Sequence, residues 1–205
     1  MVKRFSVLMV LSLLLIGSTA WAGENADATI TFDLEKEVTA GDGENTSIMD
    51  VGPDEVVVLS IYGHGLSNLK GYTIDLKFEP DLVSNTGGGF MSFSPLELDV
   101  FNSAGLTPST VGPAVSEDVV GLGSSVLKDP YTADEAPDGD GLLAWLKFTT
   151  SAEFTTATIA TFSLDKGVLI GVDGANDEVA DKPSAWLNTT AVEPTSWGQI
   201  KALFK

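Results

Sequence analysis

The stretch that decides the fold is residues 56–83, VVVLSIYGHGLSNLKGYTIDLKFEPDLV. It opens with a β-branched run and, after a turn at 67–71, alternates apolar with polar side chains. Alternation with a period of two is typical of a strand that buries one face and exposes the other. Pro80 ends this strand, because proline has no N–H for the hydrogen-bonded ladder. The buried face is expected to carry Tyr72, Ile74, Leu76 and Phe78.

The same period recurs along most of the chain. It is present in residues 28–34, 141–150 and 156–164, and clusters of Gly, Pro, Asn and Asp separate the runs. Many short alternating strands divided by turn residues predict an all-β, antiparallel sandwich. Residues 84–140 hold too few large apolar side chains for a second core, so we expect them to add weak strands and long loops to the same domain.

Residues 1–22, MVKRFSVLMVLSLLLIGSTAWA, have the layout of a secretory signal peptide. Two basic residues precede an apolar run at 7–16, and Ala20-Trp21-Ala22 places small residues around a cleavage point. The apolar run is shorter than the ~20 residues that a membrane-spanning helix needs. We therefore expect cleavage after Ala22 and an exported protein without a membrane span.

Composition limits both the partners and the chemistry. The chain of 205 residues has a formal net charge of −18, and loss of the two basic leader residues would make it 9 − 29 = −20. Such acidity disfavours nucleic acids and anionic lipid surfaces. The chain has no cysteine, so disulfides, thiolate catalysis and Cys-ligated zinc are excluded. Export without cysteine favours a bacterial secreted or cell-surface protein.

Two runs resemble the strands of cohesin modules. In residues 56–83, Gly71-Tyr72 resembles the Gly-aromatic pair of that family, and Phe78-Glu79-Pro80 stands where cohesins have Tyr-Asp-Pro. Residues 139–177, GDGLLAWLKFTTSAEFTTATIATFSLDKGVLIGVDGAND, resemble the closing cohesin strands. The resemblance implies a jelly-roll sandwich of about nine strands that binds dockerins, partner modules with duplicated Ca²⁺ loops. The same sandwich is similar to several carbohydrate-binding modules.

The residue inventory does not favour an enzyme. His64 is the one histidine of the chain, and no serine stands in a G-x-S-x-G elbow. Carboxylates are abundant, but their spacing along a sandwich does not show that two of them converge in a cleft. We expect His64 to be a turn or surface residue and the protein to be non-catalytic.

Two acidic, glycine-containing loops are candidate calcium sites. One holds Asp173, Asn176 and Asp177, and the other holds Asp138 and Asp140. Closely spaced oxygen ligands on a flexible loop suit Ca²⁺, although neither loop matches the EF-hand pattern. The alternative is that both are ordinary solvated turns, which have the same composition.

The strand GLLAWLKFTT offers a candidate binding face. If Leu146 and Phe148 point into the core, then Leu143, Trp145 and Lys147 point outward. An outward Trp can stack on a sugar ring or anchor a protein partner. The alternative is that a loop from residues 84–140 covers it.

The expected division of the chain is a signal peptide at 1–22, a sandwich at 23–180, and a C-terminal linker with a short amphipathic helix at 181–205. In that helix Trp197, Ile200 and Phe204 would share one face. A helix this short is marginal in water, so its apolar face needs a host. The host could be this sandwich, a second copy of the chain or another partner.

The sequence thus predicts an extracellular, non-catalytic module that binds a dockerin-like or other surface protein. A carbohydrate-binding module that holds polysaccharide on Trp145 is the first alternative. A self-assembling subunit of a surface layer or filament, with homo-oligomer contacts through a terminal segment, is the second.

Overall fold

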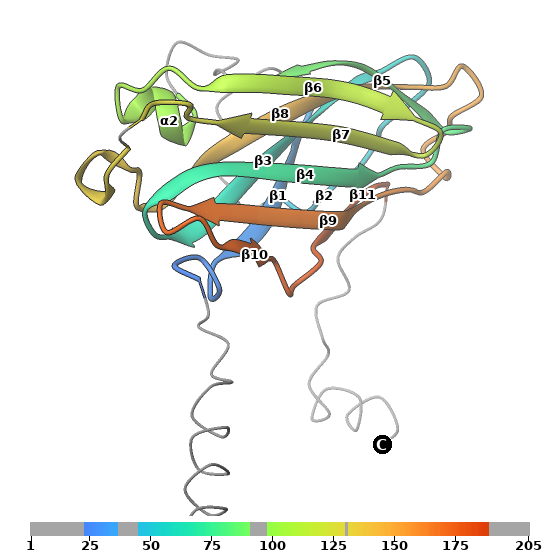
Figure 1. The fold of residues 1–205 in the computed structure, drawn as a ribbon. Helices are drawn as coiled ribbons and strands as arrows, with labels where there is room; N and C mark the ends of the chain where they lie inside the picture. Colours follow the sequence, from blue (N-terminus) through green and yellow to red (C-terminus); the bar gives the residue numbers. More distant parts are fainter. Residues whose placement is uncertain (1–22, 37–44, 91–97, 130, 189–205) are drawn as a thin grey trace, which may run out of the picture.

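The computed structural model describes residues 23–36, 45–90, 98–129 and 131–188. These residues form two stacked β-sheets with very little helix, which confirms the predicted all-β sandwich (Figure 1). The expected signal peptide at 1–22 and the expected C-terminal helix lie outside the described residues. Within the described part of the chain, no helix is long and apolar enough to cross a membrane.

The smaller sheet has four antiparallel strands. Its order is β1-β3-β8-β5, and β3 and β8 are the central pair. The strands are β1 (Thr29–Glu35), β3 (Val56–Leu66), β5 (Val83–Gly89) and β8 (Gly139–Thr150). In β3 the β-branched run of the deciding stretch is central and largely buried, as its composition predicts.

The larger sheet has seven strands and lies in front in Figure 1. Its main path is β2-β11-β9-β4-β7-β6, β10 pairs with β9, and the pairs are antiparallel except β2 with β11. The strands are β2 (Ser47–Ile48), β4 (Leu69–Lys77), β6 (Ser109–Ser116), β7 (Val119–Ser125), β9 (Ala160–Gly171), β10 (Asn176–Glu178) and β11 (Ser184–Leu187). Strand β11 therefore carries the sandwich beyond residue 180, into the segment expected to be a linker.

Residues 84–140 belong to this one sandwich rather than to a second domain. They supply β5, β6 and β7, together with a short helix, α2 (Val100–Ser103), and a 3₁₀ turn, η1 (Ala133–Glu135). The buried Asp99 caps α2 by accepting the backbone N–H groups of Phe101 and Asn102. Phe101 in turn stacks on Tyr72, with ring centroids 6.0 Å apart. The connection thus helps to fill the core instead of forming its own.

The core lies between the two sheets. All four apolar residues of the predicted β4 face are buried there: Tyr72, Ile74, Leu76 and Phe78. Phe148 of β8 contacts both Phe78 and Phe162, with ring centroids 5.5 Å and 4.7 Å apart. Full burial of one such apolar side chain stabilises the fold by about 1.5–3 kcal/mol. Alternation in β4, β8 and β9 therefore contributes directly to the core that holds the layers together.

The expectation that Leu143 faces outward is wrong. In the β3–β8 ladder Ile61 is opposite Ala144 and Tyr62 is opposite Leu142, so Leu143 is an extra residue, as in a β-bulge. The bulge turns Leu143 into the core, where it is 0% exposed. The Tyr72 hydroxyl, from the other sheet, donates a hydrogen bond to the Leu143 carbonyl. One irregular residue of β8 thus joins the two layers.

Strand β6 forms one edge of the larger sheet, and its ladder to β7 is interrupted. The register shifts between Val111 and Ala114, and Pro113 lies inside the break. Residues on the two sides of the break still pair with β7. The edge strand is therefore two short paired pieces rather than one continuous ladder.

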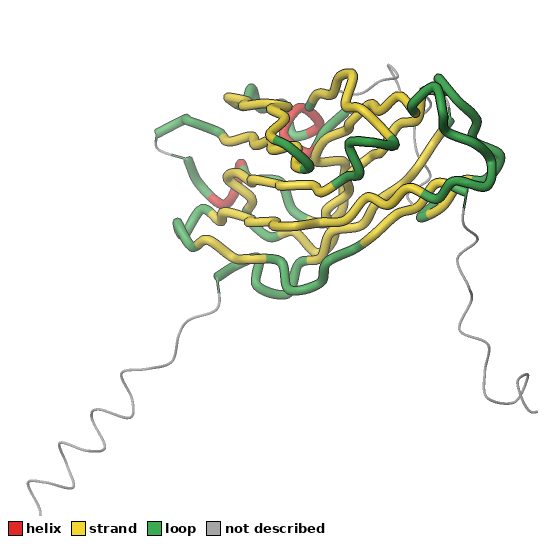
Figure 2. Tube along the Cα trace, turned by 90° about the vertical axis from the view of Figure 1, so that its right-hand side faces the viewer, coloured by secondary structure: helices red, strands yellow, loops and turns green. Residues whose placement is uncertain are grey.

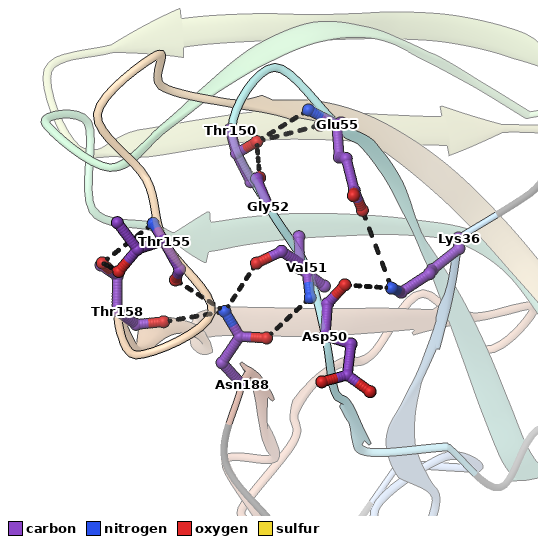
Figure 3. A network of polar contacts seen from close by, with 9 residues as sticks. All are labelled: Lys36, Asp50, Val51, Gly52, Glu55, Thr150, Thr155, Thr158 and Asn188. Carbon is purple, nitrogen blue, oxygen red and sulfur yellow. Dashed lines mark hydrogen bonds and ion pairs between the residues drawn. The ribbon is translucent and has the colours of Figure 1, made fainter.

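A buried amide closes the end of the described chain (Figure 3). The Asn188 side chain accepts the Val51 N–H at 2.8 Å and donates to the Val51 carbonyl at 2.9 Å. It also donates to the carbonyls of Thr155 and Thr158, at 3.0 and 3.1 Å. One side chain thus holds two connections, β2–β3 and β8–β9, to the end of β11. The described chain begins and ends at opposite ends of the sandwich (Figure 2).

Candidate binding surface

A groove runs along the outer face of the larger sheet, over β7. Its floor lies at Gly121 and Gly123, which place no side chain on that face. Thr73 of β4 and Val111 of β6 stand on either side of Gly123, their ladder partner. The cavity has a volume of about 510 Å³. A hollow of this size can accept a few side chains of a partner.

The groove is apolar and open to solvent. Val111 is 72% exposed on β6, and Leu127, just beyond β7, is 76% exposed. Ala114 and Ile170 extend the apolar lining, and Asp75 supplies one carboxylate. Isolated exposed apolar side chains are ordinary, but several around one concavity mark an interaction site.

Sequence reasoning missed this groove, although the residues of β7 carry a signal for it. The run VVGLGSS places Val120 and Leu122 in the core and leaves Gly121 and Gly123 on the opposite face. A Cβ at Gly121 would lie 3.0 Å from an Asp75 carboxylate oxygen, and one at Gly123 would lie 3.0 Å from the Tyr72 carbonyl. Glycine at alternate outward positions thus predicts a channel along a strand.

Trp145 and Lys147 lie half-buried and outside the core, on the β8 face opposite Leu146. Trp145 lines a second hollow of about 390 Å³ together with Phe90 and Asn102. Gly89, its ladder partner, packs against the indole: a Cβ there would lie 3.2 Å from the ring. Trp145 and the groove over β7 are therefore separate candidate surfaces, and Leu143 belongs to neither.

The first predicted calcium loop does not gather its oxygen ligands. The Asp173 carboxylate accepts the Ala175 N–H at 2.9 Å, which is a local turn. The Asp177 carboxylate is used by the backbone N–H groups of Gly23 and Asn25, each at 3.0 Å. Asn176 is exposed in β10 and pairs with β9. These groups act as backbone caps.

The second predicted calcium loop is also occupied by backbone contacts. Asp138 accepts the Asn68 N–H at 2.6 Å, and Asp140 accepts the Gly65 N–H at 2.8 Å. Among the residues that the structure describes, no group of three or more His, Cys, Asp or Glu side chains is placed to hold a metal. Neither loop fits a calcium ion as it stands, and calcium binding stays a prediction.

His64 lies between two polar side chains near the carboxyl end of β3, a central strand of the smaller sheet. Its Nε2 is 2.7 Å from the Thr31 hydroxyl, and its Nδ1 is 3.4 Å from the Asp140 carboxylate. The Gly65 N–H, and then His64, hold the pKa of Asp140 below its usual value. The order hydroxyl, imidazole and carboxylate resembles a proton relay. It lies on β1, β3 and β8, however, whereas the groove lies on the other sheet.

The remaining predicted binding residues, Trp197, Ile200 and Phe204, lie outside the described residues. The structure therefore places no predicted binding residue in the groove, and it assigns the groove to residues that the sequence reasoning did not select.

Comparison with known proteins found its matches among solved structures. No family model matches the chain, and no curated protein matches it. The second type II cohesin module of the ScaA scaffoldin of Acetivibrio cellulolyticus superposes with a TM-score of 0.55 at 16% identity, over 80% of this chain and 97% of that one. Another type II cohesin from the cellulosome of that organism gives 0.53 at 17% identity, over 78% and 95%.

A type I cohesin–dockerin complex from Clostridium thermocellum gives a TM-score of 0.54 at 7% identity, over 80% of this chain and 97% of that one. Identities this low speak for the fold, and nearly the whole of each cohesin is covered. The two-sheet sandwich described above, matched from end to end by these modules, is cohesin-like in fold.

Proposed function

We propose that this protein is a non-catalytic, extracellular module that binds a protein partner through the groove over β7. The single observation that carries the proposal is the open apolar hollow between Val111 and Leu127, on a glycine floor. A fold that exposes such side chains in water loses free energy unless a partner covers them.

The similar structures support a protein as the partner. Two of those with the same fold were solved as complexes of a cohesin with a dockerin-bearing chain, in Acetivibrio cellulolyticus and in Clostridium thermocellum. The formal net charge of −18 favours a partner with basic residues around its apolar contact. The partner we propose is a dockerin-like or other surface module with an apolar ridge and a basic rim.

The test is a binding measurement with groove variants. Immobilised protein is offered a panel of purified dockerin modules and, separately, the secretome of the source organism. Val111→Asp and Leu127→Asp each place a charge in the groove, so each should weaken capture at least tenfold, which corresponds to about 1.4 kcal/mol. Both side chains are already exposed, so stability should change by no more than about 0.5 kcal/mol.

Ile159→Asp is the matched control. Ile159 is 52% exposed but lies in the β8–β9 connection, outside the groove. Its replacement should leave binding unchanged. Equal binding by all three variants, or loss of binding by the control alone, would refute the groove as the site.

A carbohydrate is the second candidate ligand, because Trp145 and Phe90 line one hollow with the polar Asn102. Aromatic side chains beside amide groups suit a sugar ring. Under this proposal the protein is retained on insoluble polysaccharide, Trp145→Ala abolishes retention, and Val111→Asp does not. Retention that Trp145→Ala leaves intact would remove this candidate.

A further inference from the structure

Gly23, the first described residue, lies so close to Asp177 that a side chain at this position would displace the carboxylate. The Gly23 N–H donates to Asp177 Oδ1 at 3.0 Å, and its carbonyl accepts the Ala26 N–H at 3.2 Å. A Cβ on Gly23 would lie 2.2 and 2.4 Å from the Asp177 carboxylate oxygens and 2.6 Å from the Ala175 Cβ. Such distances are far inside van der Waals contact, so any side chain here would displace Asp177.

The Asp177 carboxylate accepts two hydrogen bonds from this segment. Its Oδ2 accepts the Asn25 N–H at 3.0 Å, so one carboxylate binds two backbone nitrogens of residues 23–25. The Asn25 side chain then accepts the Ser67 N–H at 2.9 Å, which joins the segment to β3 and β4. Figure 1 shows this blue loop beside β10, the strand that carries Asp177.

The charge at this site suits a cation better than a neutral amide. Asp177 is half-buried, and two further carboxylates of the same end of the sandwich, those of Glu24 and Asp173, meet at Gly171, where a Cβ would lie within 3 Å of both. The Glu24 carboxylate binds the Asn68 amide at 3.0 Å. A positive charge on the Gly23 nitrogen would turn a hydrogen bond that is charged only on its acceptor into an ion pair, which adds a Coulomb attraction to the hydrogen bond.

We propose that Asp177 is the receptor for the amino group that leader removal creates at Gly23. A signal peptidase hydrolyses the Ala22–Gly23 bond with one water molecule; Ala22 leaves with a carboxylate, and the Gly23 nitrogen takes up a proton and becomes an ammonium. That ammonium lies against Asp177 and closes the N-terminal segment onto β10. Processing therefore completes an ion pair that the precursor lacks, and the mature fold is more stable than the unprocessed one.

Export of the full chain from a bacterial host tests the position of the new terminus. Intact mass of the exported protein should correspond to a chain that begins at Gly23. Any other first residue would overturn the proposal, because a shift by one residue moves the charge away from Asp177.

The ion pair itself is tested with two starting residues and one substitution. All described strands and the core lie between residues 28 and 187, so chains that begin at Gly23 or at Ala20 keep the whole sandwich. The Ala20 chain keeps a neutral Gly23 amide facing Asp177 and moves the charge three residues away. We expect the Gly23 chain to melt about 2–4 °C higher, the shift typical of a chain of this size for one partly exposed ion pair.

Two controls separate charge from contact. The melting difference should shrink in 1 M salt, where the screening length is only about 3 Å. It should vanish in Asp177→Asn and persist in Asp173→Asn, the neighbouring carboxylate that does not bind Gly23. If Asp177→Asn does not fold, the proposal is still tested by the salt dependence of the melting difference between the unsubstituted Gly23 and Ala20 chains. Equal melting of the two chains at low salt, or a difference that salt leaves unchanged, would overturn the proposal.

Discussion

Tyr72 is the residue that connects the two layers most directly. Its ring is buried in the β4 face of the core and stacks on Phe101, while its hydroxyl donates to the Leu143 carbonyl in the other sheet. The contact exists because the β8 bulge leaves that carbonyl without a regular ladder partner. A phenylalanine would fill the same space but could not donate this hydrogen bond between the two sheets.

Replacement of Tyr72 by Phe should lower the free energy of unfolding by about 1–3 kcal/mol, the cost of a buried acceptor left without a donor. Urea unfolding with an unchanged m-value is the measurement. Tyr131→Phe is the comparison, because the Tyr131 hydroxyl also donates to a carbonyl, that of Leu69, at 3.1 Å. No loss in Tyr72→Phe would show that the hydroxyl contributes nothing.

The same residue predicts an alkaline limit to stability. Burial, and then the nearby Asp99, raise the pKa of Tyr72 well above its ordinary value, and burial raises the pKa of Tyr131 to about 12. A raised folded-state pKa means that the unfolded chain loses its proton first. The stability that these neutral tyrosine side chains contribute to the fold is thus complete below about pH 10 and is lost as the pH rises further. Unfolding measured from pH 8 to 12 should show a shallower fall in Tyr72→Phe than in the parent.

At the scale of single residues, the sequence predicted which side chains are buried better than it predicted the sheet face on which each side chain lies. The four apolar residues of β4 are in the core, as alternation predicts. Leu143 is in the core against the same rule, because one inserted residue changes which side chains face inward. Alternation cannot reveal a bulge when the residues on both sides of it are apolar, as Leu142, Leu143 and Ala144 are.

At the scale of elements, Asn188 fastens two connections. Its amide binds Val51 before β3, and Thr155 and Thr158 between β8 and β9 (Figure 3). It follows β11 directly, so β11 enters the larger sheet with its end held on both sides. A buried amide with this many partners is a specific clasp rather than a surface polar group.

Asn188→Ala should cost about 2–4 kcal/mol of unfolding free energy, because one buried N–H and several carbonyls lose their partner together. Differential scanning calorimetry of the exported protein would measure it. Asn176→Ala, at an exposed position of β10, is the control and should be close to neutral. Similar melting of the two variants would contradict the clasp.

Strands were predicted from the sequence where the alternating run is long, and they were missed where it is short. The runs at 28–34 and 141–150 lie almost wholly in strands, and the run at 156–164 is a strand only from residue 160, whereas β11 has four residues and β2 has two. Strands this short present too few alternations to recognise. They form because the neighbouring strand and the Asn188 contacts hold them.

At the scale of the whole molecule, the acidic loops are bound to the protein's own backbone. Asp138, Asp140, Asp173 and Asp177 each accept backbone N–H groups. Their sequence spacing predicted calcium, but spacing cannot show that the carboxylates turn to backbone N–H groups rather than to one shared point. A chelator should therefore leave the melting temperature unchanged. Calcium that raises it by several degrees after EDTA treatment and dialysis would restore the predicted site.

The candidate site was less predictable than the fold, for a physical reason. Large apolar residues in the sequence predict a core. The groove instead depends on the missing side chains of Gly121 and Gly123 and on the strands that flank these glycines. One of those neighbours, β4, is distant in the chain. The sequence therefore predicted a binding module but selected other surfaces for it.

The break in β6 limits the ways in which a partner can bind at this edge of the larger sheet. Pro113 brings no N–H, and the pairing with β7 slips beside it, so an incoming extended chain would find no continuous row of donors and acceptors along this rim. Strand addition is thus blocked next to the groove, and copies of the protein are kept from zipping together there. Under the proposed function, a partner in the groove is therefore recognised by the shape and side chains of a folded surface rather than by strand addition.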